Sequence, residues 1–114
     1  MKKWLLVMLS LLCTSAFAEE QRFVMEPAHC KVLRLHALKA ITGKQTGVVY
    51  PQYVRERVED SQSLVAGERL IYMDILPYSL EMAYEYYHND FNDSTPYEEV
   101  IYDNCMKRVG DVAQ

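Results

Sequence analysis

Residues 95–110, TPYEEVIYDNCMKRVG, decide the fold, because they carry both the start and the end of one helix. Thr95 and Glu98 form the T-x-x-E pattern of a capping box, in which each residue satisfies a free backbone donor at the helix start. Pro96 fits the first helical position, where no backbone N–H is needed. Gly110 can take the left-handed backbone that ends a helix. The stretch therefore predicts a helix that Thr95 caps.

The same helix carries a cysteine on its apolar face. Tyr97, Ile101 and Cys105 recur every four residues, so they share one side of the helix. Once a leader is removed, Cys30 is the only other cysteine left in the chain. In an oxidising compartment such a pair predicts a disulfide. A bridge that closes a loop of this size contributes about 4 kcal/mol of stability in the chain-entropy model.

The first residues have the features of a secretory signal peptide. Two lysines precede an apolar run at residues 4–12, and residues 16–18 read Ala-Phe-Ala, a typical cleavage site. The apolar run is about half the length that spans a bilayer. We therefore expect residues 1–18, with Cys13, to be removed after export to the periplasm, and residues 19–114 to form a single helical domain without a membrane segment.

The charge of the exported chain restricts its partners. The full chain of 114 residues has a net charge of −4, and without the two leader lysines the balance is ten basic to sixteen acidic residues. An acidic domain is a poor ligand for nucleic acids and for anionic membranes. The composition instead favours a protein partner, and a basic one.

Three more helices are expected before residue 95. The first begins at Pro27 and runs to about residue 42, where two glycines end it. Residues 51–60 form a short helix, and residues 68–88 form a long one. Pro77 should kink or split the long helix. We expect residues 19–26 to form a loose polar segment before the first helix. Strand signals are weak, so the sequence predicts an all-α fold: a small four- to five-helix bundle whose first and last helices one disulfide joins.

Helical periodicity also predicts which side chains form the core. The charged run at residues 55–59 reads as a solvated face, and His29 and His36 as surface residues, because their spacing of seven is not a chelating one. In the first helix the predicted core positions are Cys30, Leu33, Ala37 and either Ala40 or Ile41, with Val32, Leu35 and Leu38 beside them. In the short helix they are Val54 and Val58. In the long helix they are Leu70, Met73, Pro77, Leu80, Tyr84 and Tyr87.

An acidic, tyrosine-rich second half is the clearest candidate for function. Between Leu70 and Met106 the chain has eight acidic residues, seven of the nine tyrosines and no Lys or Arg. Tyrosine is enriched in interfaces, and surrounding acids steer a basic partner. Tyr78, Tyr86 and Tyr102 fall on the polar sides of their helices. The predicted partner-binding surface is a stripe that continues into the next loop: Asp74, Tyr78, Glu81, Glu85, His88, Asp90 and Asp93.

Catalytic and metal motifs are weak by comparison. The loop at residues 88–93 is rich in Asn and Asp, which invites comparison with a calcium-binding EF-hand. It has no glycine at the sharp turn, and with Asp90 as the first ligand Ile101 occupies the position of the bidentate Glu. The chain contains no G-x-S-x-G, H-E-x-x-H or P-loop motif. We therefore expect no enzyme activity, no metal site and no cofactor.

Several of these features together resemble a family. The chain resembles small two-cysteine helical periplasmic proteins in four features. These are a leader, a cysteine in both the first and the last helix, Lys-Gln-Thr-Gly at residues 44–47 and Ala-Tyr-Glu-Tyr at residues 83–86. Some of those proteins are immunity proteins against type VI secretion amidase effectors. The resemblance implies an all-helical inhibitor, often a homodimer, that plugs the active site of a toxin; of its residues, only Cys30 and Cys105 carry over.

A second resemblance is to periplasmic acid-stress chaperones, which are also small, helical and single-disulfide proteins. The 75 positions between Cys30 and Cys105 are a wider separation than such a chaperone would have. The leading hypothesis is thus a non-enzymatic periplasmic binding protein of the inhibitor or immunity type. The alternative is an acid-stress chaperone, and an envelope assembly factor remains a third option.

Overall fold

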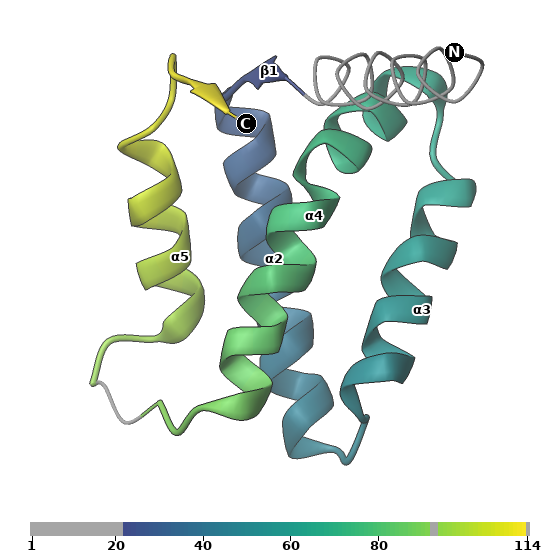
Figure 1. Ribbon diagram of the computed structural model, residues 1–114, viewed down its shortest axis with the longest axis vertical. Coiled ribbons are helices and arrows are strands. Elements are labelled where there is room, and N and C mark those ends of the chain that lie inside the picture. The colour runs from purple at the N-terminus through teal and green to yellow at the C-terminus, as the bar shows by residue number, and fades with distance from the viewer. Residues whose placement is uncertain (1–21, 92–93, 114) are drawn as a thin grey trace, which may run out of the picture.

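The computed structural model describes residues 22–91 and 94–113, and it is mostly helical. The described residues form four helices: α2 (Pro27–Gln45), α3 (Tyr50–Gln62), α4 (Ala66–His88) and α5 (Tyr97–Met106). The expected leader and Asp93 lie outside the described residues. Helix α2 packs against both α4 and α5, and α3 packs against α4. Figure 1 shows α5 and α3 on opposite sides of the α2–α4 pair.

The disulfide between Cys30 and Cys105 is confirmed, and it joins the start of α2 to the end of α5 with 5.5 Å between the Cα atoms. Both cysteines belong to the larger apolar core, together with Leu33, Ile75 and Met82. A smaller apolar cluster of Ala40, Tyr53 and Ala83 lies where α2, α3 and α4 meet. The bridge therefore fixes α5 against α2 at the centre of the main core.

The expectation that residues 19–26 form a loose polar segment is wrong for the residues just before α2. Phe23–Val24 forms a short strand, β1, that pairs antiparallel with β2 (Val112–Ala113), so Phe23 lies opposite Ala113. Met25 follows with only 5% of its surface exposed, and its backbone exchanges hydrogen bonds with Gly110 and Asp111. The two ends of the described chain are thus held together at the top of Figure 1. A pairing between segments so far apart leaves little local signal in the sequence.

The observed helix ranges are close to those predicted from the sequence, and the differences are at the helix ends. Helix α5 begins at Tyr97 with Pro96 as the N-cap in an extended conformation, so the prediction that Thr95 is the N-cap residue is wrong by one position. Gly110 does adopt a positive φ of 95° after α5, and Gly47 one of 85° after α2. Gly43, predicted to help end α2, is instead a buried residue inside it. Pro77 lies within a continuous α4, so the chain does not split there.

The predicted core face of α4 is wrong except for Leu80 and Tyr87, which pack half-buried against the smaller apolar cluster. Leu70, Met73 and Tyr84 are 68%, 48% and 51% exposed. The buried side of the helix is instead formed by Tyr72, Ile75, Leu76, Ser79, Met82 and Ala83. Helix α4 has apolar residues on two sides, and periodicity alone does not tell which side meets the rest of the fold.

Similar corrections apply to α2 and α3. Leu35 and Leu38 are exposed, although Leu33, Ala37 and Ala40 are buried as predicted. In α3 the buried residues are Tyr53, Arg57 and Ser61, whereas the expected core residue Val58 is 42% exposed. The three tyrosines that the sequence assigned to polar faces are half-buried and pack against the apolar clusters: Tyr78, Tyr86 and Tyr102.

Candidate functional site

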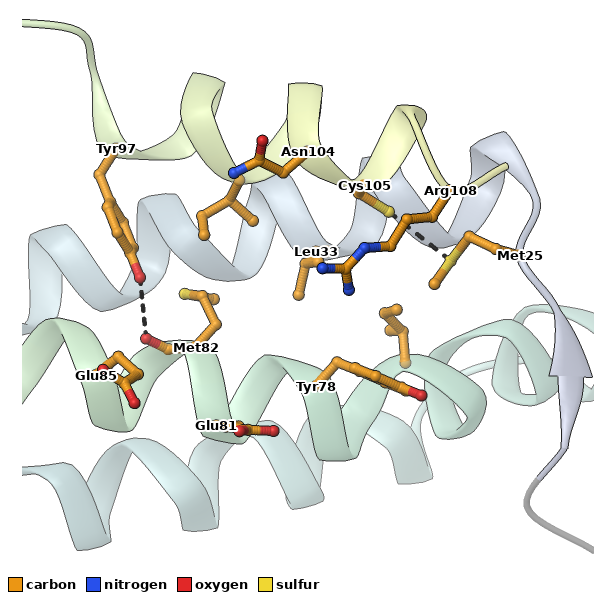
Figure 2. A pocket seen from close by; sticks show the side chains of 12 residues that line it. Met25, Leu33, Tyr78, Glu81, Met82, Glu85, Tyr97, Asn104, Cys105 and Arg108 are labelled. Carbon is orange, nitrogen blue, oxygen red and sulfur yellow. Dashed lines mark hydrogen bonds between the residues drawn. The ribbon is translucent and has the colours of Figure 1, made fainter. Parts of the chain in front are cut away.

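A groove between α4 and α5 is the best candidate for a site, because it collects three residues of the predicted binding surface. Both helices pack on α2, whose Leu33 forms part of the groove floor. The cavity has a volume of about 410 Å³, which is in the range of ligand-binding clefts. Its lining, much of it drawn in Figure 2, consists of Met25, Leu33, Ile75, Tyr78, Glu81, Met82, Glu85, Tyr97, Ile101, Asn104, Cys105 and Arg108.

Tyr97 closes one end of this groove. Its hydroxyl donates a hydrogen bond of 3.1 Å to the Met82 carbonyl, which ties the start of α5 to α4. Burial raises the pKa of Tyr97 to about 12, and the nearby Glu85 carboxylate adds to the effect. Tyr97 therefore stays neutral at any physiological pH and acts as a fixed, amphipathic wall.

Charges lie on both walls of the groove. Glu81 and Glu85 line it from α4, and Arg108 lines it from the end of α5. Figure 2 shows Glu85 near Tyr97 at one end and Arg108 near Cys105 at the other. The Glu85 carboxylate accepts a hydrogen bond of 3.2 Å from Asn89 Nδ2, which holds it at the groove end. The groove thus has an acidic end and a basic end over an apolar floor.

The remaining residues of the predicted stripe do not join this groove. Asp74 Oδ2 lies 3.2 Å from Nε2 of the buried His29. The Glu26 backbone N–H donates to His29 Nδ1, so Nε2 carries the proton and donates to Asp74. His88 stacks on Tyr84, and Asp90 is exposed beyond the end of α4. The predicted single surface is therefore split.

The sequence-based prediction missed Asn104 and Arg108, which complete the α5 wall. Both follow the helical spacing of Tyr97, Ile101 and Cys105, at positions that face the same side of the chain. That spacing could have pointed to them. The spacing does not show, however, that these two residues face α4, because that depends on how the disulfide positions α5.

A buried polar seam between α2, α3 and α4 is the second unusual feature. His36 and Ser79 are fully buried, with 2.6 Å between His36 Nδ1 and Ser79 Oγ. The Tyr53 hydroxyl donates to the His36 carbonyl at 2.9 Å, and the Tyr72 ring packs edge-on against the imidazole. Burial, with the positive charges of Arg57 and Lys39, lowers the pKa of His36 to about 4. The predictions of a surface His29 and a surface His36 are therefore both wrong.

Arg57 is the charged member of this seam, and it is 5% exposed. Its Nε lies 3.1 Å from Asp60 and its Nη2 3.6 Å from Glu56, and its guanidinium lies over the Tyr53 ring. Lys39 of α2 reaches the same Asp60 at 3.3 Å. Buried charges need such partners, so the prediction that the charged run is a solvated face fails at Arg57.

The described residues contain no group of three or more His, Cys, Asp or Glu side chains that could hold a metal ion. Within residues 22–91 and 94–113, no helix is both long enough and apolar enough to cross a membrane. No protein family, no curated protein and no solved structure matches the chain.

Proposed function

We propose that this chain is an exported, non-enzymatic binding protein of the periplasm, of the inhibitor or immunity type, that takes a basic segment of a protein partner into the α4–α5 groove. The leader-like residues 1–18 and the disulfide between Cys30 and Cys105 support export to an oxidising compartment. The lining residues support a binding role, because they include no histidine, serine, threonine or free thiol.

The observation that carries the proposal is the acidic end of the groove. Glu81 and Glu85 lie beside the apolar Met82 and Ile101, and no Lys or Arg occurs from Leu70 to Met106. A lysine or arginine of the partner would lay its aliphatic stem on the apolar floor and place its charge at the two carboxylates. Arg108 at the other end would disfavour a second cation and so would set the direction of the bound segment.

The experiment is a capture from periplasmic and secreted fractions, followed by binding kinetics with charge variants. Glu81→Lys combined with Glu85→Lys should slow association and remove most of its salt dependence, since such charges act mainly on the on-rate. A matched control, Glu59→Lys with Glu68→Lys, makes the same change in net charge at exposed positions away from the groove. Equal kinetics for both pairs would remove the groove from the interface.

The acid-stress chaperone is the second candidate, and His36 favours it. Protonation of this imidazole in acid would place a third positive charge beside Arg57 and Lys39. Among the described residues Asp60 is the one acidic group that acts on it, and Tyr53 and Tyr72 stay neutral. Helix α3 would then separate from α2 and α4 and expose apolar surface. Client-aggregation assays decide: protection in acid alone would favour the chaperone, and partner binding near neutrality would favour the inhibitor.

A further inference from the structure

Helix α4 carries a second apolar stripe on its outer side, away from α2. The stripe consists of Leu70, Met73, Pro77, Leu80 and Tyr84. Helix α3 partly covers its last turn, because Leu80 is half-buried and the Tyr84 ring packs edge-on against Tyr50. Leu70 is 68% exposed, Met73 48% and Tyr84 51%. The opposite side of the same helix is packed against the core, because Ile75 and Ser79 have no exposed surface.

The spacing of this outer stripe is that of a helix-pairing seam. Its positions alternate steps of three and four residues, as the a and d positions of a heptad repeat do. A helix that is apolar on two sides is normally packed on two sides. Isolated exposed apolar residues need no explanation, but a continuous seam along four turns of one helix points to a partner.

Acidic residues border the open edge of the stripe. Asp74 and Glu81 lie one position after Met73 and Leu80, so they occupy the same flanking position in successive heptads. The other edge faces α3, where Leu76 and Ala83 are buried. Arg69, the base that precedes the stripe, already donates to the carbonyls of Ser61, Gln62 and Leu64. The exposed flank is therefore negative, although one oxygen of Asp74 also accepts a hydrogen bond from the buried His29.

A second copy of this chain fits this surface poorly. In an antiparallel pair of α4 helices the equivalent flanks meet, so Asp74 and Glu81 of one copy would face the same carboxylates of the other. A parallel pair would need the flank that α3 already covers. Charge thus selects a different occupant, one with basic residues along a single edge.

We propose that the outer stripe of α4 receives an amphipathic helix of a partner protein, whose apolar seam packs on Leu70, Met73, Pro77 and Tyr84 and whose Lys or Arg residues face Asp74 and Glu81. This surface lies beside the α4–α5 groove on the same helix, and the two share Glu81, which lines the groove and also borders the stripe. The acidic residues of α4 then form a ridge between two apolar surfaces, the groove on one side and the stripe on the other.

A synthetic helix tests this with the intact, disulfide-bonded protein. The probe is a fluorescent three-heptad peptide with leucine at its seam positions and lysine along one flank. Two control peptides have the same composition in scrambled order, or glutamate in place of lysine. Fluorescence anisotropy should show that the basic heptad peptide binds about tenfold or more tightly than either control. Equal affinity for the three peptides, or no binding, would overturn the proposal.

Matched variants locate the site. Met73→Glu should weaken binding of the heptad peptide by about tenfold or more, whereas Leu35→Glu, at an equally exposed apolar residue of α2, should not. Both variants should stay folded, because exposed substitutions shift stability by about 0.5 kcal/mol or less. Sedimentation should show a monomer; a dimer that Met73→Glu dissociates and Leu35→Glu does not would assign the stripe to a second copy and contradict the proposal. Neither Met73 nor Leu35 lines the α4–α5 groove, so both variants should leave binding of a partner in the groove unchanged.

Discussion

His36 and Ser79 meet where α2 crosses α4, with 2.6 Å between the imidazole Nδ1 and the hydroxyl oxygen and both side chains buried. Arg57 of α3 and Lys39 of α2 act on the same imidazole with positive charge. A protonated His36 would be a buried cation beside two others, with Asp60 alone to offset them. The contact of three helices therefore depends on a neutral histidine, which makes the stability of the fold sensitive to acid.

The first prediction is a loss of stability between about pH 6.5 and pH 4. The pKa of His36 is about 4 in the folded chain and about 6.5 when the chain unfolds, so the unfolded state takes up the proton first as the pH falls. The contribution is complete above pH 6.5 and should decrease by about 3 kcal/mol by pH 4. Urea titrations over this pH range measure it.

The control for this prediction removes the ionisable group. His36→Gln should flatten the pH dependence in this window, even if it lowers stability overall, whereas His88→Gln, at an exposed position, should leave the wild-type slope intact. A wild-type slope in His36→Gln would show that other groups cause the acid sensitivity.

The second prediction concerns the disulfide. Cys30→Ala with Cys105→Ala should lower the free energy of unfolding by about 2–5 kcal/mol, because the bridge closes a loop of 75 positions and its sulfurs lie in the main core. Denaturant titration of the double variant against the oxidised protein measures the loss. A change well below about 1 kcal/mol would show that α5 is held by packing alone.

The third prediction is a coupling between Gly43 and Tyr87. A Cβ at position 43 would lie 2.7 Å from the Tyr87 hydroxyl oxygen, which is buried without a hydrogen-bond partner. Gly43→Ala alone should therefore destabilise the protein. Tyr87→Phe should be neutral or stabilising, since it removes an unsatisfied polar atom. In the Tyr87→Phe background, Gly43→Ala should stabilise by up to about 1 kcal/mol, the gain of alanine over glycine inside a helix.

The readout of this coupling is a double-mutant cycle by thermal or denaturant unfolding. The two changes should be strongly non-additive, with opposite signs for Gly43→Ala in the two backgrounds. Additive effects would mean that the Tyr87 ring moves aside at little cost.

The helix extents and the disulfide were predictable because their signals are local. Pro27 begins α2, Gly47 follows its end, and only two cysteines lie outside the expected leader. The orientation of α4 was not predictable, since Leu70 and Met73 on one side and Ile75 and Met82 on the other form equally apolar stripes. Which stripe meets α2 is decided by packing across the whole fold.

Burial of polar side chains also depended on partners far along the chain. His29 is buried because Asp74 accepts from it, His36 because Ser79 contacts it, and Arg57 because Asp60 and Tyr53 surround it. Alone, each of these residues reads as a surface residue. The candidate site shows the same limit: Tyr78, Glu81 and Glu85 were identified, but the α5 wall opposite them was not.

The central claim is that the α4–α5 groove binds a protein partner, and site-specific photo-cross-linking in the cell that carries the gene tests it most directly. A photoreactive residue in place of Asn104 lies in the groove, and one in place of the exposed Gln52 lies on α3, outside it. The account predicts a discrete cross-linked product from position 104, lost with Glu81→Lys and Glu85→Lys, and no such product from position 52. No product from position 104, or the same products from both positions, would contradict it.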